Sequence, residues 1–146
     1  MTARALAERR GDQGRLFQAI YGLWQHTAGA GQIVAARPLS DRLLRVTAAG
    51  TDADLRLQAH HSAWSTLFLG GAPAEARQHS EAGRRLYDPE AHRSHRHLYG
   101  GHDPGVCALQ TGAQLEWLLG YPDRALERTG EAIALGEQIA TLSACQ

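Results

Sequence analysis

Four histidines gather in one stretch of the chain, and a cysteine follows them: His92, His95, His97, His102 and then Cys107. Imidazole nitrogens and a thiolate are ligands that zinc accepts in proteins. Their spacing matches no closed zinc site, however, and no carboxylate is placed to orient the ligands. We therefore expect no cofactor and a solvated loop with one or two structural histidines, and we keep metal sensing by the four histidines as an alternative.

The sequence also gives little support for a catalytic nucleophile. Cys107 falls in the first turn after Asp103-Pro104, where a helix N-terminus lowers the pKa of a thiol. No base or oxyanion site accompanies it, so a buried, inert thiol is expected. His60 and His61 are adjacent, and adjacent side chains on a helix point about 100° apart, so the two rarely serve one site. The serines between residues 62 and 80 lack nucleophile-elbow glycines. The sequence thus predicts a protein without catalysis of its own.

Composition excludes several classes of protein. The 146 residues carry 15 basic and 15 acidic side chains, a balance that argues against a nucleic-acid partner. Two cysteines are too few for a disulfide scaffold and favour a reducing compartment. Residues 1–15 lack the apolar run of a signal peptide, and no apolar run is long enough to span a membrane. We expect a cytoplasmic protein with no membrane partner.

Apolar residues recur at intervals of three and four, as on helices that bury one face. Proline at the first helical position and glycine after the last one mark helix boundaries, as at Pro73, Pro122 and Gly120. No stretch alternates as a strand would. These signals predict an all-α superhelix of about three helix pairs. The predicted pairs span 12–49, 52–87 and 103–140, and an inserted loop spans 88–102.

One pattern occurs three times and supports this assignment. Each copy places a glycine five residues before an alanine and a small hydroxyl residue four further on: Gly31, Ala36 and Ser40; Gly71, Ala76 and Ser80; Gly120, Ala125 and Thr129. Such repeats are typical of stacked helical arrays, which bind partners along a shared surface. Residues 3–10 resemble the end of a preceding helix and residues 142–146 the start of another, so we expect a fragment of a longer array.

The three tryptophans are predicted to have different roles. Trp24 and Trp64 each lie seven residues before the repeat glycine, and we expect them to fill the gap between paired helices. Trp117 sits four residues later in this register and faces the groove instead. In such arrays the first helices line the concave surface, and matching positions on them face it together. The predicted partner groove is lined by Gln18, Tyr21, Gln25, Gln58, His61, Ser65, Gln110, Gln114 and Trp117. Ordinary solvent exposure is the alternative for these positions.

Two segments resemble one family closely: Leu98-Tyr99-Gly100-Gly101-His102-Asp103-Pro104-Gly105-Val106-Cys107, and Trp117-Leu118-Leu119-Gly120-Tyr121-Pro122-Asp123-Arg124-Ala125-Leu126. They are similar to the tetratricopeptide-type region on the C-terminal side of large bacterial regulatory ATPases, many of which carry a class III adenylate/guanylate cyclase domain. The resemblance covers nearly the whole chain. It implies an interaction and sensor segment that regulates an attached signalling ATPase or cyclase, without cyclase activity here. A phosphate loop is excluded because the chain has no lysine.

The function predicted from these observations is binding of a protein or peptide segment, including an attached ATPase or cyclase domain. Two alternatives stay open. One is a packing or self-association segment that forms a homo-oligomer, because open array ends expose apolar helix faces. The other is sensing of a metal or small molecule through the histidine-rich loop.

Overall fold

The computed structural model describes residues 3–48, 50 and 52–144, and within these the side chains from Asp12 to Thr141. The chain is all-α: 81% of it is helix, and no strand occurs in the described part. Its helices are α1 (Ala3–Gly29), α2 (Ile33–Ala48), α3 (Ala53–Leu69), α4 (Pro73–Leu86), the short α5 (His95–Leu98), α6 (Pro104–Leu118) and α7 (Pro122–Ala144). None of them is both long and apolar enough to cross a bilayer.

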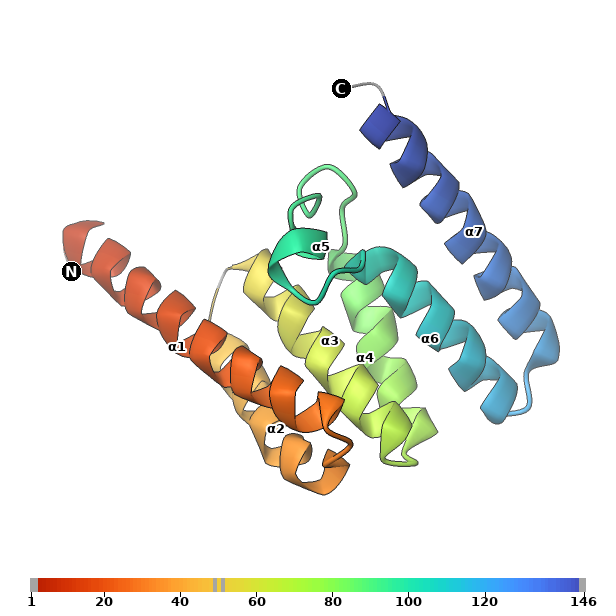
Figure 1. The fold of residues 1–146 in the computed structure, drawn as a ribbon, viewed down its shortest axis with the longest axis horizontal. Helices are drawn as coiled ribbons and strands as arrows, with labels where there is room; N and C mark the ends of the chain where they lie inside the picture. The colour runs from red at the N-terminus through yellow and green to blue at the C-terminus, as the bar shows by residue number, and fades with distance from the viewer. Residues whose placement is uncertain (1–2, 49, 51, 145–146) are drawn as a thin grey trace.

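The long helices form three antiparallel pairs that stand in a row (Figure 1). Within each pair α1 packs on α2, α3 on α4, and α6 on α7. Neighbouring pairs join through α2 with α3 and through α4 with α6, while α3 also contacts α1 and α6. The first helices of the pairs, α1, α3 and α6, thus follow one another, and the second helices do the same. This arrangement is that of a helical solenoid.

The repeated glycine and alanine have clear structural roles. Gly31, Gly71 and Gly120 occupy the turns between paired helices with φ of 75°, 77° and 86°, a region that side chains with a Cβ disfavour. Five residues on, Ala36 and Ala76 are 0% exposed. A small side chain at this point lets the second helix of a pair approach the first closely. The repeat therefore records how each hairpin turns and packs.

Two predicted boundaries are wrong. Residues 3–10 are not the end of a separate helix, because α1 runs unbroken from Ala3 to Gly29. Gly11 and Gly14 each weaken a helix by only about 1 kcal/mol, and no proline interrupts it. At the other end, residues 142–144 belong to α7 and do not start a new helix. Cys145 and Gln146 lie outside the described residues.

Both predicted core tryptophans are buried. Trp24 lies among side chains of α1, α2 and α3, and its indole N–H donates a 2.8 Å hydrogen bond to Thr66 Oγ1. Trp64 is 0% exposed and packs on Leu57 and Ala108. It also covers Gly83 of α4 so closely that a Cβ at Gly83 would lie 2.3 Å from the Trp64 ring. Trp117 is 66% exposed.

A histidine pair connects α3 to α4 and predicts how stability depends on pH. His60 Nδ1 and His79 Nδ1 are 2.9 Å apart, so one neutral ring donates to the other. Burial, with the charges of His79, Arg56 and Arg85, lowers the pKa of His60 to about 4, and burial lowers the pKa of His79.

Because the unfolded chain takes up protons near pH 6.5 and the folded chain does not, the free energy of unfolding should fall as the pH drops from 7 to 5. We expect a loss of about 1 kcal/mol after allowing for solvent screening of this half-buried pair. Urea denaturation at both pH values measures it. His60→Gln should reduce the loss, and an equal loss in that variant would contradict the assignment.

Candidate functional site

The segment between α4 and α6 folds back over the first helices, so it is not simply the solvated loop expected at 88–102. It contains α5, and Tyr99 at the end of that helix is only 8% exposed. The Tyr99 ring meets the Tyr21 ring edge to face, with centroids 5.2 Å apart. His92 and His95 of this segment are each 2% exposed. The segment therefore covers the middle of the row formed by α1, α3 and α6.

At the edge of this cover, three side chains from different parts of the chain converge. His61 comes from α3, His102 from the last residues before α6, and Cys107 from the first turn of α6. The His61 and His102 Nε2 atoms are 3.1 Å apart, and the Cys107 sulfur is 3.7 Å from His61 Nε2. The three ligand-type atoms all lie within 4.8 Å of one another. We call these residues the His61–His102–Cys107 cluster.

Nδ1, the ring nitrogen on the side away from the cluster centre, faces an oxygen in both His61 and His102. His102 Nδ1 is 3.1 Å from the carbonyl oxygen of Gly100. His61 Nδ1 is 3.0 Å from Gln58 Oε1 and 3.2 Å from the Tyr21 hydroxyl. Since a carbonyl oxygen can only accept, His102 Nδ1 must carry a proton, and the Gln58 oxygen favours the same tautomer in His61. While both rings are neutral, both Nε2 atoms then present lone pairs toward the centre of the cluster, where a proton or a cation would be shared.

The electrostatics of the cluster favour a thiolate. Burial alone would raise the pKa of the Cys107 thiol, but hydrogen bonds with His102 and His61, in which a protonated ring donates its Nε2–H to the sulfur, outweigh it and lower that pKa to about 6. In return, the hydrogen bond with Cys107 raises the pKa of His102. The expected full burial of this thiol is wrong, because Cys107 is only partly buried and its sulfur lies near two imidazoles; its expected lack of reactivity stays a prediction.

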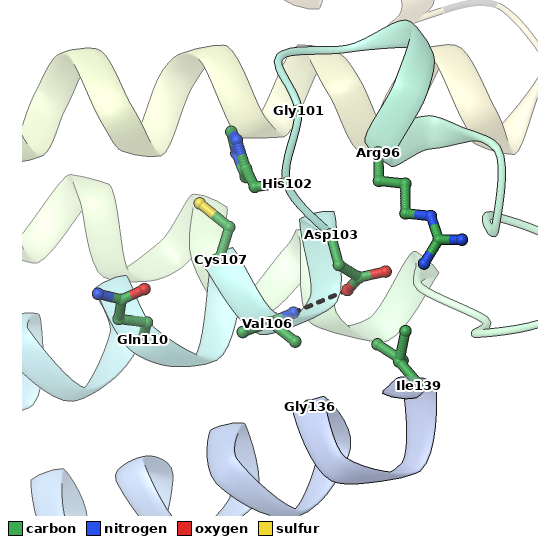
Figure 2. A pocket seen from close by; sticks show the side chains of 9 residues that line it. All are labelled: Arg96, Gly101, His102, Asp103, Val106, Cys107, Gln110, Gly136 and Ile139. Carbon is green, nitrogen blue, oxygen red and sulfur yellow. Dashed lines mark hydrogen bonds between the residues drawn. The ribbon is translucent and has the colours of Figure 1, made fainter. Parts of the chain in front are cut away.

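A cavity of about 500 Å³ opens beside the cluster. Figure 2 shows His102 and Cys107 next to each other on one wall, and α7 with Gly136 and Ile139 on the other. Asp103 lies between these two walls and caps α6. Its Oδ1 accepts hydrogen bonds from the backbone N–H groups of Gly105 and Val106. This cap positions the residues on either side of it, His102 and the first turn that carries Cys107.

A second cluster lies near the first and contains Asp54, His92 and His95. The Nε2 atoms of His92 and His95 lie 3.2 Å and 3.5 Å from the Asp54 carboxylate oxygens, and His92 Nε2, as oriented, makes no hydrogen bond with a described residue. His95 Nδ1 lies 2.8 Å from Gln58 Nε2, an amide nitrogen that can only donate, so His95 carries its proton on Nε2. The two imidazoles thus anchor the inserted segment to the start of α3 by contacting Asp54.

The histidines singled out from the sequence divide into three groups. His92 and His95 join the Asp54 cluster, and His102 joins the His61–His102–Cys107 cluster. His97 belongs to neither; it is exposed and accepts a hydrogen bond from Arg96. The spacing of the four predicted no shared site, and they do not form one.

Sequence reasoning gave His61 a place in the groove and missed its role in this cluster. One signal was available: Leu57, His61 and Trp64 follow one another at helical spacing on one face of α3, and all three are at most 4% exposed. A histidine on a buried stripe needs polar partners. Asp54, in the first turn of the same helix, carried no comparable signal.

The predicted groove residues also separate. Tyr21, Gln58 and His61 are buried beneath the inserted segment, so these three do not line an open groove. The other six are exposed or partly exposed: Gln18, Gln25, Ser65, Gln110, Gln114 and Trp117. Of these, Gln110 and Gln114 line a second cavity of about 430 Å³ between α6 and α7.

The chain is similar to part of one larger bacterial protein. The chain is 30% identical over 140 residues to a protein of Rhizobium meliloti (strain 1021) named "Uncharacterized protein R02095". The aligned part is 92% of this chain but 13% of that protein, so the chain spans a small fraction of its relative's length. No family model matches the chain, and no solved structure matches it. What these comparisons do show is similarity to one segment of a much larger protein.

Proposed function

We propose that the chain is an interaction and regulatory module that binds a protein or peptide segment in the groove between α6 and α7. The observation that carries this proposal is the cavity between these helices. Gln110 and Gln114, two of the residues predicted to line the partner groove, contribute to it. Val106, Ala113 and Ile133 supply apolar surface beside the two amides. Amides beside apolar side chains suit a peptide, whose backbone needs hydrogen-bond partners while its side chains are buried.

The similarity to a small part of a much longer protein supports an array that acts beside other domains. A cytoplasmic signalling ATPase or cyclase, attached to the module or separate from it, is the partner class that the family resemblance implies. In this proposal the module has no reaction of its own.

Site-specific photocrosslinking in cells tests the groove. A photoreactive residue at Gln114 should crosslink to a discrete partner, whereas the same residue at Gln78, an exposed glutamine on α4, should not. Ile133→Asp should reduce crosslinking from position 114 at least about tenfold, since an unpaired carboxylate in an apolar contact opposes binding by more than 1.4 kcal/mol.

Ile133 is 59% exposed, so Ile133→Asp should leave the thermal midpoint of the module nearly unchanged. A crosslinked product of twice the chain's mass would support self-association in place of a different partner. Equal crosslinking from positions 78 and 114 would contradict the groove.

A further inference from the structure

We propose that His61, His102 and Cys107 form a binding site for a divalent transition-metal ion of the zinc type, with its fourth coordination position open to the adjacent cavity. The site joins three separate parts of the chain: α3, the end of the inserted segment, and the first turn of α6.

Two of the three distances between the ligand atoms match those of a tetrahedral zinc site, and the third is below 4.8 Å. With Zn–N bonds of about 2.0 Å and a Zn–S bond of about 2.3 Å, tetrahedral angles place two nitrogens about 3.3 Å apart and a nitrogen and sulfur about 3.5 Å apart. The corresponding distances here are 3.1 Å between the two Nε2 atoms and 3.7 Å between His61 Nε2 and Cys107 Sγ. For these two pairs an ion would require shifts of only a few tenths of an ångström.

The hydrogen bonds around the histidines are those of metal ligands. A zinc-bound imidazole usually donates its outer N–H to a carbonyl or carboxylate oxygen, which fixes the ring and its tautomer. The Gly100 carbonyl faces His102 Nδ1, and Gln58 Oε1 faces His61 Nδ1, in this way. Two unprotonated Nε2 atoms 3.1 Å apart repel each other unless a proton or a metal cation lies between them. A metal ion would satisfy both lone pairs together with the thiolate.

The neighbouring Asp54–His92–His95 cluster lacks this arrangement. Gln58 can present its oxygen to only one side, and it presents the oxygen to His61 and the nitrogen to His95. His95 therefore points an N–H at Asp54 and has no lone pair for a metal there. One amide thus makes His61 a metal ligand and His95 a hydrogen-bond donor.

The open coordination position connects the metal site to the proposed peptide groove. The metal site does not depend on that groove being correct. His102 and Cys107 line the larger cavity, and Gln110, one turn further along α6, lines both this cavity and the groove between α6 and α7. Three protein ligands and one open position are the arrangement of zinc sites that accept water or another ligand. A bound metal would also tie the inserted segment to α3 and α6.

Cobalt(II) and zinc binding to the full chain tests the proposal. The protein is purified metal-free and reduced in a Cys145→Ser background, so that Cys107 is the remaining thiol. Cobalt(II) should produce a thiolate-to-metal charge-transfer band at one ion per chain, and zinc should displace it. Zinc should also protect Cys107 from alkylation by iodoacetamide.

Matched variants locate the site. Cys107→Ser should abolish the charge-transfer band, and His102→Gln should weaken zinc binding at least about 100-fold, more than loss of a supporting hydrogen-bond partner does. The control variant His92→Gln removes an imidazole of the other cluster and should change zinc affinity less than about threefold, well below the effect of even a supporting residue. Circular dichroism melts confirm that each variant folds; His102 is exposed, so its replacement is tolerated.

Absence of a cobalt–thiolate band in the folded parent protein would overturn the proposal. So would zinc binding that survives Cys107→Ser and His102→Gln but is lost in His92→Gln. Either result leaves the α6–α7 groove untouched, because the crosslinking experiment does not depend on metal.

Discussion

Replacing Trp64 with alanine is expected to lower the free energy of unfolding by about 3–5 kcal/mol. The side chain is 0% exposed and packs among residues of α3, α4 and α6, so its removal leaves a cavity where two helix pairs meet. Urea denaturation followed by far-ultraviolet circular dichroism measures the change. Trp117→Ala is the matched control: this side chain is 66% exposed, and its removal should change stability by less than about 0.5 kcal/mol.

A second substitution tests whether the contact between Trp64 and Gly83 limits how closely α4 packs on α3. Gly83→Ala alone should destabilise the protein by about 1–3 kcal/mol, because the added methyl group overlaps the Trp64 ring. In the Trp64→Ala background the same change should stabilise by up to about 1 kcal/mol, through the better helix propensity of alanine. If Gly83→Ala changes stability in the same direction in both backgrounds, the contact with Trp64 does not limit the packing of α4.

Asp103→Ala is expected to cost about 2–3 kcal/mol of stability in the metal-free protein. Asp103 Oδ1 accepts hydrogen bonds from the backbone N–H groups of Gly105 at 2.9 Å and Val106 at 3.0 Å, and Oδ2 accepts one from the Tyr87 hydroxyl at 2.8 Å. Alanine removes the cap of α6 and leaves the Tyr87 hydroxyl without its acceptor. Thermal and urea denaturation of the two proteins give the difference.

A double-mutant cycle with Tyr87→Phe separates the two contributions. If the Tyr87 hydrogen bond contributes, Asp103→Ala should cost about 1 kcal/mol less in the Tyr87→Phe background. Asp103→Asn provides an intermediate, because its oxygen still caps the helix while its amide nitrogen cannot accept from Tyr87. Full additivity would assign the entire effect of Asp103→Ala to the cap.

Much of the fold was accessible from sequence because the signals for it are local. A glycine that must adopt positive φ, an alanine where two helices touch and an aspartate before Pro104 each act within a few residues. Repetition of the same signals three times strengthened the assignment. Local signals failed at α1, where residues 3–10 resembled the end of a separate helix but lie within one continuous helix.

The candidate site could not be predicted from local sequence signals in the same way. Sequence reasoning grouped His92, His95, His97 and His102 because they are close along the chain, whereas the structure separates them into two clusters and one exposed side chain. Cys107 was grouped with these histidines, but nothing in the sequence placed His61 beside it. Their role depends on the inserted segment, whose path over α3 no local rule predicts.

The sequence alone determined an all-α chain of repeated helical hairpins, since periodicity, capping and turn glycines are properties of neighbouring residues. Only the tertiary structure decided which polar side chains meet. His61, His102 and Cys107 converge because three helix pairs and the inserted segment pack together, and the Gln58 amide, buried among them, decides which histidine keeps a free lone pair. Such long-range packing depends on the whole chain, so no window of sequence contains it.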